Sequence, residues 1–323
     1  MKISRRRVLR SAAGAAAWPA FSRTVFADSY PSRPVQMVVP FPPGSAPDIV
    51  ARLSGRWLAE RLGQNFVVEN RPGAGSNIGT EFVVRAQADG YTILADVLSN
   101  VLNASLYHHL NFDFMRDIAP VATVANAPYV VLVTKSLPAK TIPQLIAYAK
   151  ANPGKINFAS GGIGTSTHIF GLLFMSMAGV ELVHVPYRTN YMPDLISGQV
   201  QMIINPIPQS MEFVKGGKVR ALAVTTKNPL PALPDLPTVS QFLPGYEATG
   251  WYGIGAPKET PPDIIDKLNA ATNAALDEPA AKTRLAALGV EPLRKTPAQF
   301  AEFIAAENDK WGKVIRAANV KLD

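Results

Sequence analysis

Short apolar runs alternate with helix-length amphipathic segments along most of this chain, and this alternation limits the fold more than any other feature. We predict strands over Val35–Phe41, Phe66–Glu69, Tyr91–Ala95, Tyr129–Thr134, Ile156–Ser160, Leu182–Pro186, Val200–Ile204 and Ala221–Thr225. Most of these runs are apolar at consecutive positions, as expected for strands that helices cover on both faces. The pattern therefore predicts α/β domains with mainly parallel or mixed sheets.

The intervening segments carry helix-end signals. Asp48–Leu62 is expected to end at Gly63, and Thr165–Ala178 at Gly179, because glycine adopts the left-handed conformation that ends helices. A third helix is predicted over Pro261–Leu276. Thr296-Pro297-Ala298-Gln299 is a capping box that predicts the start of a long C-terminal helix.

A chain of this length usually divides into two domains. No sharp linker separates them, which fits two lobes joined by two crossing segments, expected near Val130–Thr134 and Trp251–Ala256. We therefore predict a first domain over 28–131 plus 253–323 and a second domain over 132–252.

Residues 1–27 are interpreted as an export signal. A basic start with Lys2 and several arginines precedes a short stretch of small and apolar residues, and cleavage is expected after Ala27. The run 4–10 is similar to a twin-arginine signal, although Val8 stands where Phe is usual; the general secretory route is the alternative.

The formal net charge of +8 comes largely from that segment, which holds one Lys, five Arg and no acid. The remaining chain is near +2, so its charge indicates no nucleic-acid partner. It has no Cys, hence neither a disulfide nor a lipid-anchored N-terminal Cys, and no later apolar segment is long enough to span a membrane. We expect a freely diffusing monomer in the periplasm.

Two segments place a glycine-containing loop between a strand and a helix, where open α/β sheets bind ligands. In the first, Gly44 and Ser45 precede the helix, whose N–H groups and dipole would attract a carboxylate. Asp48 is expected to organise this loop without touching an anion. In the second, Gly161 and Gly164 precede a helix from Thr165 or Ser166. Two such helix starts facing each other would suit a dicarboxylate.

Four stretches, at 39–48, 67–79, 158–168 and 183–188, resemble in order and spacing the Bug-type receptors of tripartite tricarboxylate transporters. The resemblance runs from about Tyr30 to Asp323. It implies a two-lobed, type II-like periplasmic binding protein that captures a small organic carboxylate and delivers it to a membrane permease. It also implies no enzymatic activity and no cofactor.

Carried over by position, the resemblance implies a pocket that includes Phe41, Pro42, Gly44, Ser45, Ala46, Ser99, Asn100, Ser160, Gly161, Gly164, Thr165, Ser166, His168, Tyr187 and Asn205. We add Asp48, Arg188 and Tyr191 as candidates. Other interpretations stay open. The glycines can be simple turn residues, Asn205 a strand-end cap, and His168 or Tyr191 packed core residues. The motif at 70–79 is interpreted as a turn that braces the cleft.

The loop after Tyr187 departs from the family pattern, because the usual glycine is absent and the loop is about two residues short. If Tyr191 and Met192 line the pocket, the ligand is expected to have an apolar or aromatic body.

Enzyme motifs such as G-x-S-x-G, H-E-x-x-H and the Walker A loop are missing, which leaves a secreted hydrolase as a weak alternative. Adjacent His108 and His109 diverge and make a poor metal pair. The other alternative is a receptor coupled to another transporter or to a sensor kinase.

Overall fold

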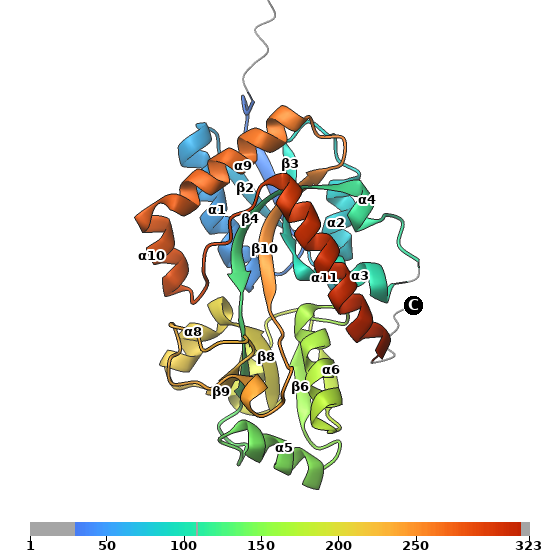
Figure 1. The fold of residues 1–323 in the computed structure, drawn as a ribbon, viewed down its shortest axis with the longest axis vertical. Helices are drawn as coiled ribbons and strands as arrows, with labels where there is room; N and C mark the ends of the chain where they lie inside the picture. Colours follow the sequence, from blue (N-terminus) through green and yellow to red (C-terminus); the bar gives the residue numbers. More distant parts are fainter. Residues whose placement is uncertain (1–29, 108, 318–323) are drawn as a thin grey trace, which may run out of the picture.

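The computed structural model describes residues 30–107 and 109–317, so the predicted export signal and its cleavage position lie outside the described residues. Two five-stranded sheets form two lobes that lie one above the other along the long axis of the molecule (Figure 1). Both sheets are mixed, because each combines parallel and antiparallel pairs.

The first lobe contains a sheet of order β2-β1-β3-β10-β4. Its strands are β1 (Val35–Val39), β2 (Phe66–Asn70), β3 (Thr92–Val97), β4 (Ile118–Ala127) and β10 (Gly250–Pro257). Its helices are α1 (Ala46–Leu62), η1 (Ala74–Ser76), α2 (Asn77–Val84), α3 (Leu98–Leu106), α4 (Phe114–Asp117), α9 (Pro262–Asp277), α10 (Pro279–Ala287) and α11 (Pro297–Ala317). β1 runs parallel to β2 and β3, whereas β10 runs antiparallel to β3 and β4.

The second lobe contains a sheet of order β7-β6-β8-β5-β9. Its strands are β5 (Tyr129–Val133), β6 (Asn157–Ser160), β7 (Val183–Pro186), β8 (Met202–Pro206) and β9 (Arg220–Val224). Its helices are α5 (Ile142–Ala151), α6 (Ser166–Ala178), α7 (Met192–Ser197), α8 (Ile207–Lys215) and η2 (Val239–Gln241). β6 is parallel to β7 and β8, and β5 is antiparallel to β8 and β9.

The chain passes between the lobes twice. It leaves the first sheet at Ala127 and enters the second at Tyr129, because β5 pairs only with β8 and β9. It returns at Gly250, where β10 begins to pair with β4. We propose that the domain boundary lies at these two crossings, a few residues before the limits at 131 and 253 expected from the sequence.

All eight strands predicted from apolar runs are present, with ends shifted by at most a few residues. The long strand β4 was missed. Of the predicted mainly parallel or mixed sheets, the mixed arrangement is confirmed, because β5 and β10, each second from one edge of its sheet, form antiparallel pairs. The capping box is confirmed, since Thr296 N donates to Gln299 Oε1 (3.1 Å) and Gln299 N donates to Thr296 Oγ1 (3.2 Å).

Helix α11 belongs to the first lobe but also contacts the second (Figure 1). Its Phe300 packs edge-on against Trp251 of β10, with ring centroids 5.2 Å apart. Nearer its C-terminal end, the Trp311 ring lies 4.9 Å from the ring of Phe170 in α6. The lobes are therefore joined by buried aromatic packing as well as by the two crossings.

Among the described helices, none is both long and apolar enough for a membrane span.

Candidate functional site

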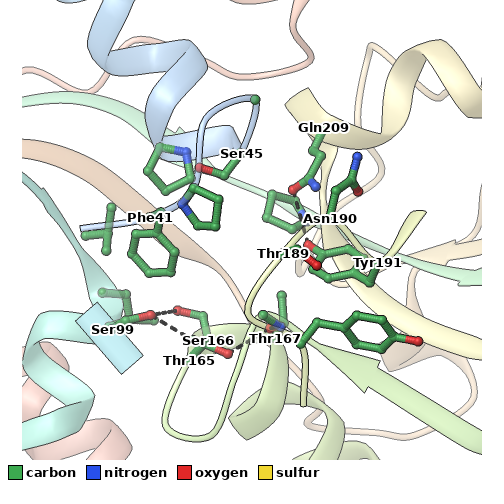
Figure 2. Close-up of a pocket in the computed structure, with 18 of the residues that line it drawn as sticks. Phe41, Ser45, Ser99, Thr165, Ser166, Thr167, Thr189, Asn190, Tyr191 and Gln209 are labelled. Carbon is green, nitrogen blue, oxygen red and sulfur yellow. Dashed lines mark hydrogen bonds between the residues drawn. The ribbon is translucent and has the colours of Figure 1, made fainter. Parts of the chain in front are cut away.

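A cavity lies between the two lobes, with about 740 Å³ of empty space when the part open to solvent is included. Figure 2 shows its walls. Phe41 and Ser45 come from the first lobe, while Thr189, Asn190, Tyr191 and Gln209 face them from the second. The carboxyl ends of β1, β3, β6, β7 and β8 all supply lining residues, as expected for a ligand site in α/β sheets.

The loop between β1 and α1 forms one wall. Gly44 adopts φ +76°, a left-handed conformation that favours glycine, and Ser45 is the N-cap residue of α1. The Ser45 hydroxyl makes no capping bond, and its Oγ atom is buried without a hydrogen-bond partner among the described residues. A buried, unpaired hydroxyl costs free energy, so this oxygen is ready to bond to a ligand.

Asp48 fixes that loop from behind and does not line the cavity. Its carboxylate accepts hydrogen bonds from Gly44 N (2.9 Å), Asn70 Nδ2 (2.9 Å) and Arg52 Nε (3.1 Å). Burial raises its pKa, but these bonds and the charge of Arg52 together lower the pKa below the ordinary value. Asp48 therefore stays ionised and holds the loop, as expected from the sequence.

The loop between β6 and α6 forms the opposing wall and is held by its own side chains and by Ser99 of α3. The bonded pairs are Gly161 N with Thr167 Oγ1 (2.9 Å), Gly162 N with Ser160 Oγ (3.2 Å), Gly164 N with His168 Nδ1 (3.3 Å) and Ser166 N with Ser99 Oγ (3.1 Å). Several backbone N–H groups that were expected to face a carboxylate thus have partners inside the protein. In the first loop, too, Gly44 N and Ser45 N donate to Asp48 Oδ2 and Pro42 O, so the two loops differ in the unpaired Ser45 hydroxyl and not in their backbone donors.

Two histidines support this second loop. His168 and His184 stack with centroids 4.1 Å apart, and His184 Nε2 lies 2.6 Å from Ser160 Oγ. Burial lowers the pKa of His168 to about 3, with a further contribution from the charge of His184, and burial lowers the pKa of His184 to about 4. Both rings are neutral at pH 7. His168 lies behind the cavity, which agrees with the packed interpretation.

Ser99 and Ser166 connect the lobes at the cavity. Their hydroxyls lie 3.2 Å apart, and Figure 2 shows the two side chains in contact. Asn100, which follows Ser99, is buried away from the cavity: its Oδ1 accepts from Val97 N (2.9 Å) and its Nδ2 donates to Thr80 Oγ1 (2.6 Å). Asn100 therefore joins α3 to α2.

Aromatic residues at the two crossings complete the cavity. Tyr129 begins the first crossing strand, and Trp251 and Tyr252 stand in the returning strand β10. Tyr252 Oη and Trp251 Nε1 are both buried without hydrogen-bond partners among the described residues. Together with Ser45 Oγ, they are three donor groups that the described protein leaves unpaired.

The remaining wall follows the shortened loop after β7. Tyr187 donates to Asp194 Oδ2 (2.6 Å), and Asn190 Oδ1 accepts from Met192 N (3.0 Å), so this loop is well braced. Tyr191 is buried and lines the cavity, with its hydroxyl 2.6 Å from Asn205 Oδ1. It is thus both a local core residue and a wall residue. Asn205 lies behind it.

The cavity has a simple charge distribution. Arg188 is exposed and is the only Arg, Lys, His, Asp or Glu among the lining residues that the structure describes. The tyrosines remain neutral: burial raises the pKa of Tyr129 and that of Tyr187 to about 12, and also raises those of Tyr191 and Tyr252. One positive charge and unpaired donors suit an anion with oxygen acceptors.

A wider hollow of about 1350 Å³, again counting open space, lies beside this cavity and shares Phe41, Gly161 and Arg188 with it. The motif at 70–79 lines the hollow. Ala74 (φ 45°) and Ser76 (φ 97°) are the only described non-glycine residues with positive φ. Asn103 Nδ2 holds this turn by donating to Gly75 O (2.7 Å). This motif therefore forms a rigid edge of the cleft.

The structure brings most predicted residues to the cavity. Those that line it are Phe41, Pro42, Gly44, Ser45, Ser99, Gly161, Thr165, Ser166, Tyr187, Arg188 and Tyr191. Those that do not line it are Ala46, Asp48, Asn100, Ser160, Gly164, His168 and Asn205. The second group lies one layer behind the first, where Asp48, Ser160, His168 and Asn205 orient lining residues or their loops.

Sequence reasoning missed several lining residues, chiefly Tyr129, Gln209, Trp251 and Tyr252. A signal for Gln209 existed, because it stands in the first turn of α8, directly after β8, at a third strand-to-helix junction. The three aromatic residues stand at the crossings, which lie next to any cleft between the lobes.

Within the described part of the chain, no group of three or more His, Cys, Asp or Glu side chains could hold a metal ion.

Residues 50–320 match the profile described as the tripartite tricarboxylate transporter family receptor. The protein BugT of Bordetella pertussis is 37% identical over 92% of this chain and 93% of its own length. A UPF0065 protein of a Pseudomonas species is 39% identical over 97% of this chain and 94% of its own length.

Solved structures share the same fold. Rpa4515 of R. palustris, solved with adipate, has a TM-score of 0.88 and 35% identity, covering 90% of this chain and 99% of that one. The periplasmic binding protein BugD has a TM-score of 0.87 and 35% identity, with coverages of 90% and 99%. MatC from Rhodopseudomonas palustris, with bound malate, has a TM-score of 0.85 and 31% identity, with coverages of 88% and 100%.

Proposed function

This chain belongs to the tripartite tricarboxylate transporter receptor family, and from that premise we propose that it captures a small organic carboxylate and delivers it to a transporter permease. Members of the family are periplasmic solute-binding proteins, and the two-lobed fold with a cleft between lobes is the fold of such receptors. The resemblance drawn from four sequence stretches is thereby confirmed.

The observation that carries the proposal is the chemistry of the cavity between the lobes. It has unpaired donors in Ser45 and Tyr252, a guanidinium at its edge in Arg188, and no lining acid among the described residues. An ionised carboxylate supplies the acceptor oxygens and the negative charge that this wall lacks. Adipate and malate in two relatives support the same class of ligand.

The ligand is bound and released unchanged in this proposal. The Ser45 hydroxyl has no base beside it, and the His168 and His184 rings lie behind the wall and are fixed by Gly164 and Ser160. No nucleophile–base pair of the kind that activates a hydrolase faces the cavity in the described structure. Export of the precursor and cleavage after Ala27 complete the proposal, with the mature receptor a monomer in the periplasm.

Binding can be tested with the mature protein, beginning at Asp28, in a thermal-shift panel of mono-, di- and aromatic carboxylates. A true ligand at about 100 times its Kd should stabilise the protein by about 2.7 kcal/mol. The methyl ester of the same acid, which lacks the charge, should give little shift. Absence of a shift with every acid, or conversion of the ligand into a new product, would contradict the proposal.

Delivery needs a separate measurement. Uptake of the labelled acid should require both the receptor and the permease, and Arg5→Lys/Arg6→Lys precursor should remain in the cytoplasm if the twin-arginine route is used. Uptake that continues after deletion of the receptor would show that this protein serves another partner.

A further inference from the structure

A chain of polar side chains runs behind the second-lobe wall, from α8 to the cavity. Ser210 Oγ donates to Pro206 O (2.7 Å), and Asn205 Nδ2 donates to Ser210 Oγ (2.7 Å). Asn205 Nδ2 also lies 3.9 Å from Met192 Sδ, a weak acceptor. These contacts fix the Asn205 amide, so that its Oδ1 atom faces Tyr191.

Tyr191 sits between two amide side chains. Its Oη atom lies 2.6 Å from Asn205 Oδ1 and 3.2 Å from Gln209 Oε1. A phenol has one hydrogen, so it can donate to only one of these oxygens. The shorter distance is typical of an O–H···O bond, which assigns the hydrogen to Asn205.

The Tyr191 oxygen can then only accept a bond from Gln209. Amide nitrogen and oxygen are assigned from the hydrogen-bond network, and 3.2 Å is within the range of an N–H···O bond. Rotation of the Gln209 amide by half a turn places Nε2 against Tyr191. Gln209 is half-buried and lines the cavity, and its other terminal atom has no protein partner among the described residues. That atom becomes an acceptor, Oε1.

Across the cavity, the first lobe presents the opposite polarity. Ser45 and Tyr252 leave hydroxyls unpaired, and these donors suit carboxylate oxygens. The Gln209 acceptor instead requires a hydrogen-bond donor on the ligand. An ammonium group would lack a counter-charge, because no described lining residue is acidic, so a neutral hydroxyl fits better.

We propose that Gln209 is a specificity-determining residue whose Oε1 accepts a hydrogen bond from a hydroxyl group of the ligand. The protein is then selective for hydroxycarboxylates over the same acids without the hydroxyl. This inference rests on the proposed function of the cavity as a carboxylate site and adds the substituent that the second lobe recognises.

Calorimetry on the mature protein can test this with matched probes that differ by one hydroxyl: malate against succinate, and 4-hydroxybenzoate against benzoate. The better-binding pair should show a preference of about tenfold or more for the hydroxylated acid, since an unpaired buried acceptor is costly. Equal binding within every pair that binds would overturn the role of Gln209 and leave the proposed function standing. Binding of no probe would remove the basis of both.

Variants then locate the preference. Gln209→Met removes the acceptor at similar volume and should reduce the preference to within about threefold, mainly by weakening the hydroxylated acid. Tyr191→Phe, which frees the amide to turn, should reduce it in the same direction. Gln241→Leu, at an exposed position in η2, is the control and should keep the preference. An unchanged preference in folded Gln209→Met would overturn the proposal.

Discussion

The loop before α1 and the loop before α6 both lead a strand into a helix at the cavity, yet they are held in opposite ways. The first is fixed by Asp48, whose pKa is lowered, and it leaves Ser45 Oγ unpaired. The second is fixed by hydroxyls and by His168 and His184, whose pKa values are also lowered but which must stay neutral. Two loops in the same strand-to-helix position therefore produce one wall with an unpaired hydroxyl donor and one whose polar groups are bonded within the protein.

This difference separates binding from bracing. In the first lobe, the group that meets the ligand and the group that holds the loop are distinct residues, Ser45 and Asp48. In the second lobe, Thr165 and Ser166 line the cavity but are themselves part of the bracing network. Removing the lining hydroxyl of Ser45 should therefore affect affinity selectively, whereas removing the lining hydroxyl of Thr165 should affect stability as well.

The largest expected effect is acid sensitivity of the second loop. The folded-state pKa values of His168 and His184 lie below the ordinary value of about 6.5, so the unfolded protein binds protons at a higher pH than the folded protein does. The contribution of the two neutral rings to stability is therefore complete above pH 6.5 and is lost as the pH falls towards 4. The slope should approach about 1.4 kcal/mol per pH unit for each histidine. Urea denaturation at pH 7.5, 6 and 5 measures it.

The double variant His168→Gln/His184→Gln is the control for that titration. It should be less stable than the natural protein at pH 7.5 but should lose most of the dependence between pH 6.5 and 5. A natural protein whose unfolding free energy stays constant over this range would show that the histidines keep their ordinary pKa values.

Next in size is the effect of Ser45→Ala on affinity. Losing a hydrogen bond to a charged group costs about 1.5–3 kcal/mol, so Kd for the cognate acid should rise about 10- to 100-fold. The melting temperature of the free protein should not fall, because Ser45 Oγ has no described protein partner to lose and is unpaired while buried. Calorimetry and a thermal melt together make the measurement.

Thr165→Ala is the matched variant in the second loop. Thr165 Oγ1 donates to Gly162 O (2.7 Å), so this change should lower the melting temperature of the free protein. The comparison between the loops breaks if Ser45→Ala destabilises the free protein more than Thr165→Ala does.

Asp48→Asn should reduce stability by about 1–2 kcal/mol, since it weakens bonds from Gly44, Asn70 and Arg52. The lowered pKa makes the contribution of ionised Asp48 complete above about pH 4 and lost only as the pH falls through the lower folded value. The loss measured by urea denaturation should therefore be equal at pH 7 and pH 5. A loss that disappears at pH 5 would contradict this assignment.

The smallest expected effect separates the two glycines. Gly44→Ala places a side chain at φ +76° and should cost about 1 kcal/mol. Gly161→Ala meets only ordinary contacts, with Thr167 Oγ1 at 3.7 Å and Tyr191 Cε1 at 3.8 Å, and should cost less than about 0.5 kcal/mol. Equal losses of stability for the two variants would show that backbone conformation at Gly44 is unimportant.

Local patterns predicted the parts of the fold that local physics determines. Helix ends at Gly63 and Gly179 and the cap at Thr296 followed from single residues, and apolar runs located eight strands. Strand β4 and the antiparallel position of β10 depend on pairing between segments more than a hundred residues apart. Such pairing leaves no local pattern, which explains why the prediction of mainly parallel or mixed sheets included neither β4 nor the strand order.

The candidate site likewise contains residues that local sequence could predict and residues whose position depends on tertiary structure. Gly44, Ser45 and Thr165 could be found because strand-to-helix loops face the cleft. The sequence could not show that His168 and Ser160 lie behind their loop, since the direction of each side chain depends on packing against β7. Gln209 and Tyr252 were missed because tertiary structure alone brings α8 and β10 to the same cavity.

Helix α11 has a consequence for how quickly the cleft can open. If the lobes were joined only at Pro128 and Gly250, they could swing apart by bending two short segments. The contact between Trp311 and Phe170 adds a third point of attachment beside the first crossing, because the Phe170 ring also lies 4.7 Å from the ring of Tyr129. Opening has to shift or separate these two buried rings, and we expect this to add to the activation barrier for ligand exchange. We expect residence time in the cleft to be governed partly by this aromatic contact, independently of which acid is bound.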